Sequence, residues 1–111
     1  MSGADRRSGD ERRATNRFPV ESEIEWETDG SRRPGMMSDV SFDGCFVMTG
    51  GDVANGTPVR IFLPLDDGMK VQYSGKVANS VADIGFGVRF DPLSAPQRDV
   101  LLSLVKSFKA S

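Results

Sequence analysis

The sequence PVRIFLPLDDGMKVQYSGKV, residues 58–77, contains two runs in which apolar residues recur at every second position, separated by a short acidic turn at residues 66–68. Successive side chains of a β-strand point to opposite faces, so this alternation indicates strands with one buried face. The turn ends in a glycine, as many hairpin connections do. The stretch therefore predicts two strands of a mainly β protein. Their buried positions are expected to be Val59, Ile61, Leu63 and Leu65, followed by Val71, Tyr73 and Val77.

Four more segments have the same strand pattern. Residues 18–27 alternate apolar side chains with glutamates, and shorter strands are expected at MMSDVS (36–41), CFVMT (45–49) and IGFGVRF (84–90). Polar or glycine-rich connections separate them, namely DGSRRPG (29–35), FDG (42–44) and GGDVANGT (50–57). In FDG, Gly44 is suited to a positive φ. Six short strands spaced by about ten residues predict a small six-stranded antiparallel β-barrel.

The C-terminal sequence PLSAPQRDVLLSLVKSFK, residues 92–109, has a helical pattern instead. Ser94 and Gln97 are spaced as in a capping box, and Pro96 is acceptable in the first turn. One apolar stripe follows at the spacing of a helix face: Val100, Leu101, Leu104, Val105 and Phe108. We expect a helix of about three turns that packs this stripe over an end or flank of the barrel.

The N-terminal residues divide the chain in two. Residues 1–16 contain only small, polar and charged types, apart from Met1, and have no strand or helix period, so we expect a flexible arginine-rich arm there. Residues 17–111 form the expected barrel domain with its helix. The first residues have no apolar core of the kind that secretory signals carry, and no stretch reaches the roughly 18 apolar residues of a membrane span. We therefore expect a cytoplasmic protein without membrane insertion.

The residue types present exclude several kinds of chemistry. The chain has no histidine and a single cysteine, so acid/base catalysis by histidine, a zinc or copper site and an internal disulfide are not expected. Cys45 lies in the apolar run CFV and is interpreted as a buried inert thiol in preference to a nucleophile. The net charge of −2 argues against binding to nucleic-acid polymers. We expect neither an enzyme nor a cofactor or metal site.

The positive charge is concentrated near the N-terminus. Five of the ten arginines lie in the first seventeen residues, and Arg13 and Arg17 are four apart in RATNR, which has no apolar helical face and is expected to be a loop. An arginine presents a planar fork of donors that can chelate a phosphate or the O6 and N7 acceptors of guanine. Two or three arginines on one loop can therefore surround a small anion.

A second polar motif, DVSFDG at residues 39–44, complements these arginines. On a strand, Asp39 and Ser41 would face outward together while Val40 points into the core. A carboxylate accepts hydrogen bonds, and guanine offers donors at N1 and N2 as well as acceptors at O6 and N7. One carboxylate and one arginine fork can thus satisfy both edges of a guanine. Gly44 would allow a close backbone approach or a tight turn.

RATNR before the first strand and DVSFDG at the second, within a six-stranded barrel closed by a helix, resemble the PilZ domain family of bacterial cyclic di-GMP receptors. The resemblance extends from about Glu11 to Phe108 and includes GCFV, PVRIFLPL and GFGVRF followed by PLS. It implies that Arg13 and Arg17 hold phosphates and guanine, that Asp39 and Ser41 bind guanine and neighbouring groups, and that Gly44 supplies close backbone approach. Arg12 stands where the family carries an extra arginine when two intercalated ligand molecules bind, which implies two molecules per domain.

These motifs lead to one main hypothesis and two alternatives. The main one is a non-enzymatic sensor, in which cyclic di-GMP draws the N-terminal arm against the Asp39 face and the closed arm signals to an unidentified downstream protein. A PilZ-like protein-interaction domain that binds no nucleotide is the first alternative. A barrel that binds single-stranded RNA is the second, although the outward glutamates of the first strand argue against it.

Other notable side chains have simpler interpretations. Trp26 is interpreted as core or edge packing in preference to a base-stacking platform, and Met36 and Met37 as packing residues in preference to metal ligands. Arg32 and Arg33 are expected in a solvent-exposed loop, from which they could also approach the same anion.

Overall fold

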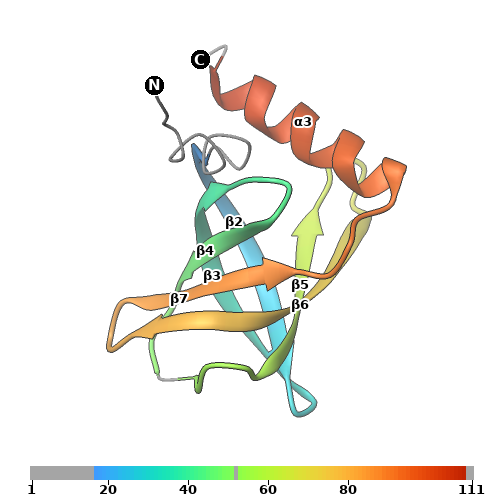
Figure 1. Ribbon diagram of the computed structural model, residues 1–111. Coiled ribbons are helices and arrows are strands. Elements are labelled where there is room, and N and C mark those ends of the chain that lie inside the picture. The colour runs from blue at the N-terminus through green and yellow to red at the C-terminus, as the bar shows by residue number, and fades with distance from the viewer. Residues whose placement is uncertain (1–16, 52, 110–111) are drawn as a thin grey trace, which may run out of the picture.

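A computed structural model describes residues 17–51 and 53–109 of the chain. Its strands and its helix follow one another along the chain (Figure 1). They are β2 (Phe18–Thr28), β3 (Ser31–Val40), β4 (Gly44–Met48), β5 (Pro58–Pro64), β6 (Lys70–Val81), β7 (Gly85–Phe90) and α3 (Ala95–Lys109). The expected arm, residues 1–16, lies outside the described residues.

The six strands close into an antiparallel barrel in the order β2-β3-β4-β7-β6-β5. The hairpin predicted from residues 58–77 is present, with Ile61 opposite Tyr73 and Leu63 opposite Val71. Closure is completed by short pairing between β2 and β5, where Trp26 lies opposite Ile61. The predicted fold class, a six-stranded antiparallel barrel followed by a C-terminal helix, is confirmed.

The barrel interior is filled by the side chains of the predicted apolar faces. Trp26, 1% exposed, contacts the ring of Phe86 edge to face at a centroid distance of 4.9 Å. Tyr73 lies against Phe90 at 5.3 Å between ring centroids. Two residues that were expected in strands lie just outside them. Leu65 follows the end of β5, and Ile84 precedes β7 and is exposed. Trp26 and Met37 are core residues, as interpreted from the sequence.

The helix α3 begins with the predicted capping box. The backbone N–H of Ser94 donates to Oε1 of Gln97 at 2.8 Å, and the N–H of Gln97 donates to Oγ of Ser94 at 3.2 Å. The hydroxyl of Tyr73 donates to the carbonyl oxygen of Gln97 at 2.9 Å, which ties the first turn to β6, and burial raises the pKa of this phenol. Leu101 enters the core, so the helix covers one end of the barrel (Figure 1).

The prediction of a loop over residues 29–35 is wrong. The reversal needs only Asp29 and Gly30, which have φ values of 52° and 78°, the conformation of a tight two-residue hairpin turn, and β3 begins at Ser31. Pro34 is tolerated within β3 because β4 pairs with β3 only from Met36 onward, so no neighbouring strand requires a donor from it on that side. Arg32 and Arg33 consequently lie on a strand.

The helix found in the described part of the chain is too short and too polar to cross a membrane.

Candidate functional site

The two polar motifs of the sequence meet at the start of β2. Pairing of Pro19 with Asp39 brings the residue before β2 close to the end of β3. Nη1 of Arg17 donates to Oδ1 of Asp39 at 2.8 Å, although the two residues are 22 positions apart. The side chains are 50% and 33% exposed, so the ion pair remains open to solvent and to a ligand. The predicted juxtaposition of an arginine and a carboxylate is therefore present in this structure.

A bulge turns Asp39 outward. Met37 and Val40 are both fully buried although they are three residues apart, which strict alternation does not allow. The register between β3 and β4 shifts between Met37 and Asp39, and the extra residue leaves Ser38 and Asp39 on the outside. The pairing of β2 with β3 is irregular at the same level, between Pro19 and Ser22. These irregularities place the carboxylate of Asp39 within hydrogen-bond distance of Arg17.

Ser41 differs from the expectation that it faces outward beside Asp39. It follows the end of β3 and is only 6% exposed. Its Oγ accepts the N–H groups of Asp43 at 3.1 Å and Gly44 at 3.3 Å, and it donates to the carbonyl oxygen of Gly44 at 3.4 Å. A short side chain that closes a turn on its own backbone in this way holds the loop in shape. In this structure Ser41 is a structural residue of the turn.

Gly44 also has a different role from the expected positive φ. It is absent from the glycines with positive φ, and it is paired with Arg89 of β7. A Cβ at this position would collide with the carbonyl oxygen of Val88. The glycine is therefore required because the backbone of β7 lies close to it. A close backbone approach was expected at Gly44, but in this structure the neighbour is a strand of the barrel and not a ligand.

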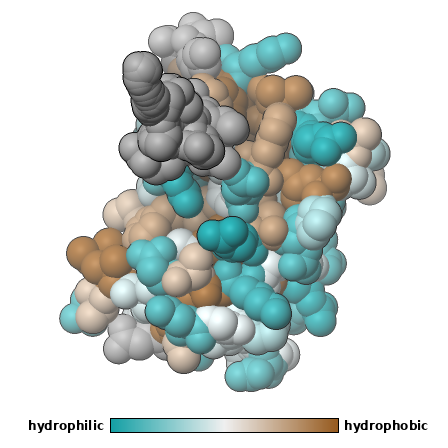
Figure 2. All heavy atoms as spheres, in the orientation of Figure 1, coloured by the Kyte–Doolittle hydropathy of each residue, from teal (hydrophilic) through white to brown (hydrophobic). Residues whose placement is uncertain are grey.

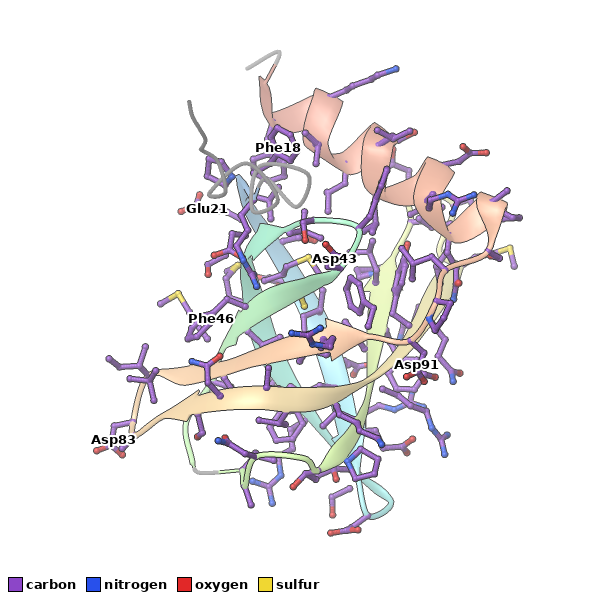
Figure 3. All side chains as sticks on the ribbon, in the orientation of Figure 1. Phe18, Glu21, Asp43, Phe46, Asp83 and Asp91 are labelled. Atoms are coloured by element: carbon purple, nitrogen blue, oxygen red, sulfur yellow. The ribbon has the colours of Figure 1, made fainter. Side chains whose placement is uncertain are left out.

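These residues border a pocket of about 260 Å³, lined by Arg17, Ser41, Asp43, Ala78, Val88 and Arg89. We call it the Arg17 pocket; Asp39 is joined to it through the ion pair with Arg17. Figure 3 labels Asp43 in the turn between β3 and β4, at the side of the barrel below the helix. Figure 2, in the same orientation, shows hydrophilic side chains over the middle of this face. The pocket thus combines two arginines with carboxylates on a polar surface.

Four of these lining residues were not predicted as site residues from the sequence: Asp43, Ala78, Val88 and Arg89. Arg89 is the outward residue between Val88 and Phe90, so its direction was implied by the alternation in GFGVRF. Its proximity to the two motifs depends on the pairing of β4 with β7, which the sequence alone does not specify. Ala78 reaches the pocket at a register shift in β6, between Val77 and Asn79.

Cys45 lies beneath this region and is fully buried. The pKa of its thiol is raised to about 12, chiefly by burial and also by the nearby negative charge of Asp39, while Arg17 opposes the shift. Because the thiolate is the reactive form, the side chain is inert at neutral pH. The interpretation of Cys45 as a buried thiol is confirmed.

Two of the predicted ligand-binding residues, Arg12 and Arg13, lie outside the described residues. Among the residues that are described, no group of three or more side chains is arranged to hold a metal ion. Arg32 and Arg33 do not line the Arg17 pocket. Arg32 instead stacks over Phe62 at 3.9 Å from the ring centroid and pairs with Glu25 at 3.8 Å.

A larger hollow of about 830 Å³ lies on another part of the barrel surface and contains none of the motif residues. Apolar side chains such as Met36 and Met48 line it together with Glu23 and Glu25. Its volume exceeds that of the Arg17 pocket, but the chemistry predicted from the motifs is found at the smaller site.

A family comparison agrees with this arrangement. The family model for the PilZ domain matches residues 11–107, which is most of the chain and includes both motifs. The chain belongs to the PilZ domain family. This is a family of regulatory receptor domains for cyclic di-GMP, so the resemblance inferred from the motifs is confirmed.

Solved structures of three proteins have a similar fold. The PilZ domain of CeSA from a cellulose-synthesizing bacterium matches with a TM-score of 0.66 and 22% identity, covering 86% of this chain and 99% of that one. PlzA of Borreliella burgdorferi in complex with c-di-GMP matches with a TM-score of 0.66 and 11% identity, covering 81% of this chain and 39% of PlzA. The Bacillus subtilis inhibitor of motility MotI/DgrA matches with a TM-score of 0.63 and 12% identity, covering 93% and 49%.

At these identities the structural matches establish the fold alone, and the chain spans less than half of PlzA and of MotI. A search among curated proteins finds no significant match.

Proposed function

We propose that this PilZ domain is a non-enzymatic receptor for cyclic di-GMP that acts in the cytoplasm of a bacterium and regulates a downstream protein. The observation that carries the proposal is the contact between Arg17 and Asp39 at the edge of the Arg17 pocket. It joins the two motifs that define the family resemblance. The proposed ligand-binding residues are Arg12, Arg13, Arg17, Asp39, Ser41 and Gly44, the last two through the turn that they shape.

The proposed recognition follows from donor and acceptor chemistry. The carboxylate of Asp39 accepts hydrogen bonds from N1 and N2 of guanine, and the guanidinium of Arg17 donates to O6 and N7 or to a phosphate. In this structure these two groups satisfy each other. An exposed pair of this kind contributes only about 0–1 kcal/mol to stability, so a ligand that supplies several charge-assisted hydrogen bonds can displace or bridge it.

The proposal extends to the arginines that precede the barrel. Arg13 and Arg17 are four positions apart, and an extended chain spans at most about 14 Å over four residues, so both arginines can reach one ligand. Binding would fix residues 11–16 against the pocket face, and a partner that recognises only this ordered surface would respond to ligand concentration. Arg12 would contact a second, intercalated cyclic di-GMP molecule, which gives two ligands per domain.

A calorimetric titration with cyclic di-GMP tests the proposal, with cyclic di-AMP and GMP as matched controls. We expect saturable binding of cyclic di-GMP and no comparable binding of the controls. The adenines of cyclic di-AMP lack the N1 and N2 donors that Asp39 requires, and GMP offers only one base and one phosphate to the site. A stoichiometry of two would support the intercalated pair, and a stoichiometry of one would refute that part alone. Hydrogen exchange of peptides covering residues 11–16, with and without ligand, tests their ordering.

One observation favours the alternative of a protein-interaction domain that binds no nucleotide. Ser41 uses its hydroxyl within the turn, and Arg17 and Asp39 are paired with each other, so these motif groups have partners within the chain. If cyclic di-GMP gives neither heat nor thermal stabilisation at high concentration, the receptor proposal is refuted, and a protein partner should be sought instead.

A further inference from the structure

Two charged side chains of the Arg17 pocket have no partner among residues 17–51 and 53–109. The guanidinium of Arg89 and the carboxylate of Asp43 both line the pocket, and neither forms an ion pair or a side-chain hydrogen bond with a described residue. Arg17 and Asp39, in contrast, are paired with each other. Within the described part of the chain, the pocket therefore holds a second arginine and a second carboxylate whose charged groups are not used by another side chain.

The backbone fixes these two residues next to each other. The N–H of Phe90 donates to the carbonyl oxygen of Asp43 at 2.7 Å, and Gly44 pairs with Arg89 across β4 and β7. Arg89 projects from a strand that is paired on both sides, and the Asp43 N–H is held by Ser41. Groups mounted on rigid backbone bind a ligand with little ordering cost, because they are already positioned.

Electrostatics restrict what a free carboxylate at this place can do. An exposed carboxylate repels the two phosphates of a cyclic dinucleotide, so Asp43 weakens binding unless the ligand brings hydrogen-bond donors to it. Among the groups of cyclic di-GMP, the N1 and N2 atoms of guanine are such donors. The neighbouring Arg89 offers the donors that O6 and N7 of the same base require.

We propose that Arg89 and Asp43 form a second guanine-binding set, which recognises the second base of cyclic di-GMP while Arg17 and Asp39 recognise the first. This inference rests on the proposed function. It assigns a binding role to two residues outside the defining positions of RATNR and DVSFDG. It also predicts that the protein distinguishes ligands with two guanines from ligands with one.

The test compares cyclic di-GMP with the hybrid 3′,3′-cyclic GMP-AMP by calorimetry. The parent should bind the hybrid about 10- to 100-fold more weakly, because one set then faces an adenine. Arg89→Ala and Asp43→Ala should weaken cyclic di-GMP binding by a similar factor and leave hybrid binding almost unchanged, so the ratio of affinities approaches one. Arg60→Ala and Asp66→Ala, exposed residues outside the pocket, are the matched controls and should keep the parent ratio.

The outcomes separate this inference from the proposed function. If the parent fails to bind cyclic di-GMP, the proposed function fails and the inference with it. If the parent binds both dinucleotides equally, the receptor function stands and the second set is refuted. The second set is also refuted if Arg89→Ala and Asp43→Ala leave both affinities unchanged, because neither residue would then contact the ligand. It is refuted as well if Arg89→Ala lowers both affinities by the same factor, because Arg89 would then attract anions without recognising a base. Thermal unfolding of each variant checks that the barrel is intact.

Discussion

The barrel interior and the Arg17 pocket lie on opposite sides of the same strands, but different features of the sequence determine them. The interior follows from alternation of apolar residues, which recurs in every strand and fills the barrel with Trp26, Tyr73 and Phe86. The pocket depends on places where alternation fails, at the bulge beside Asp39 and the register shift beside Ala78. Variants should therefore separate into those that unfold the barrel and those that affect only the ligand site.

The largest expected effect on stability comes from the interior. Trp26→Ala removes a fully buried ring that contacts Phe86 and whose Nε1 donates to Oγ1 of Thr49 at 3.3 Å. Deletion of a buried aromatic side chain typically lowers the free energy of unfolding by about 3–5 kcal/mol. Urea unfolding measures it, with Phe42→Ala, an exposed aromatic residue, as the control. A loss below about 1 kcal/mol for Trp26→Ala would contradict the assignment of this ring to the core.

The next largest effect is expected at a residue that the family resemblance assigns to the ligand. Gly44→Ala places a Cβ against the carbonyl oxygen of Val88, so β4 and β7 must separate. We expect a destabilisation of about 1–3 kcal/mol or more. Gly50→Ala is the control, because a Cβ there meets no atom within 4 Å. Equal stability of the two variants, with ligand binding lost only in Gly44→Ala, would restore the role of Gly44 as a ligand contact.

Ser41→Ala tests whether the motif serine belongs to the fold or to the ligand. The substitution leaves the N–H groups of Asp43 and Gly44 without their acceptor in a buried turn. Loss of a buried hydrogen-bond partner costs about 1–3 kcal/mol, so we expect lower stability in urea unfolding even without ligand. Cyclic di-GMP affinity should fall too, since the turn carries Asp43. A variant as stable as the parent but deficient in binding would instead indicate direct contact with the ligand.

These differences explain what the sequence reveals and what it leaves open. The strands, the barrel and the capping box of Ser94 and Gln97 were predictable because each depends on local patterns of a few residues. The motif residues Arg17 and Asp39 were found by their chemical type. The connection at Asp29 and Gly30 was predicted to be longer than it is, because the charged residues that follow it resemble a loop although they lie on β3.

The burial of Ser41 and the position of Arg89 were beyond sequence reasoning. Ser41 leaves the strand just where alternation would place it outside, so a period of two gives the wrong face. Arg89 is 72 residues from Arg17 in the chain, and only the pairing of β4 with β7 brings it to the pocket. Contacts of this kind depend on strand order, which patterns along one chain do not encode.

The smallest effects on stability are expected for the two single variants Arg17→Ala and Asp39→Ala. Both side chains are substantially exposed, so loss of their ion pair should change the free energy of unfolding by less than about 1 kcal/mol. Their affinity for cyclic di-GMP should nevertheless fall by about 10- to 100-fold, because each removes charge-assisted hydrogen bonds. Asp39→Ala should also lose discrimination against cyclic di-AMP. Urea unfolding and calorimetry on the same preparations measure both quantities, and a double variant shows whether the two residues act together. Variants that are unstable as well as unable to bind would mean that the pocket and the interior are not separable, because the ion pair would then hold the start of β2 in place.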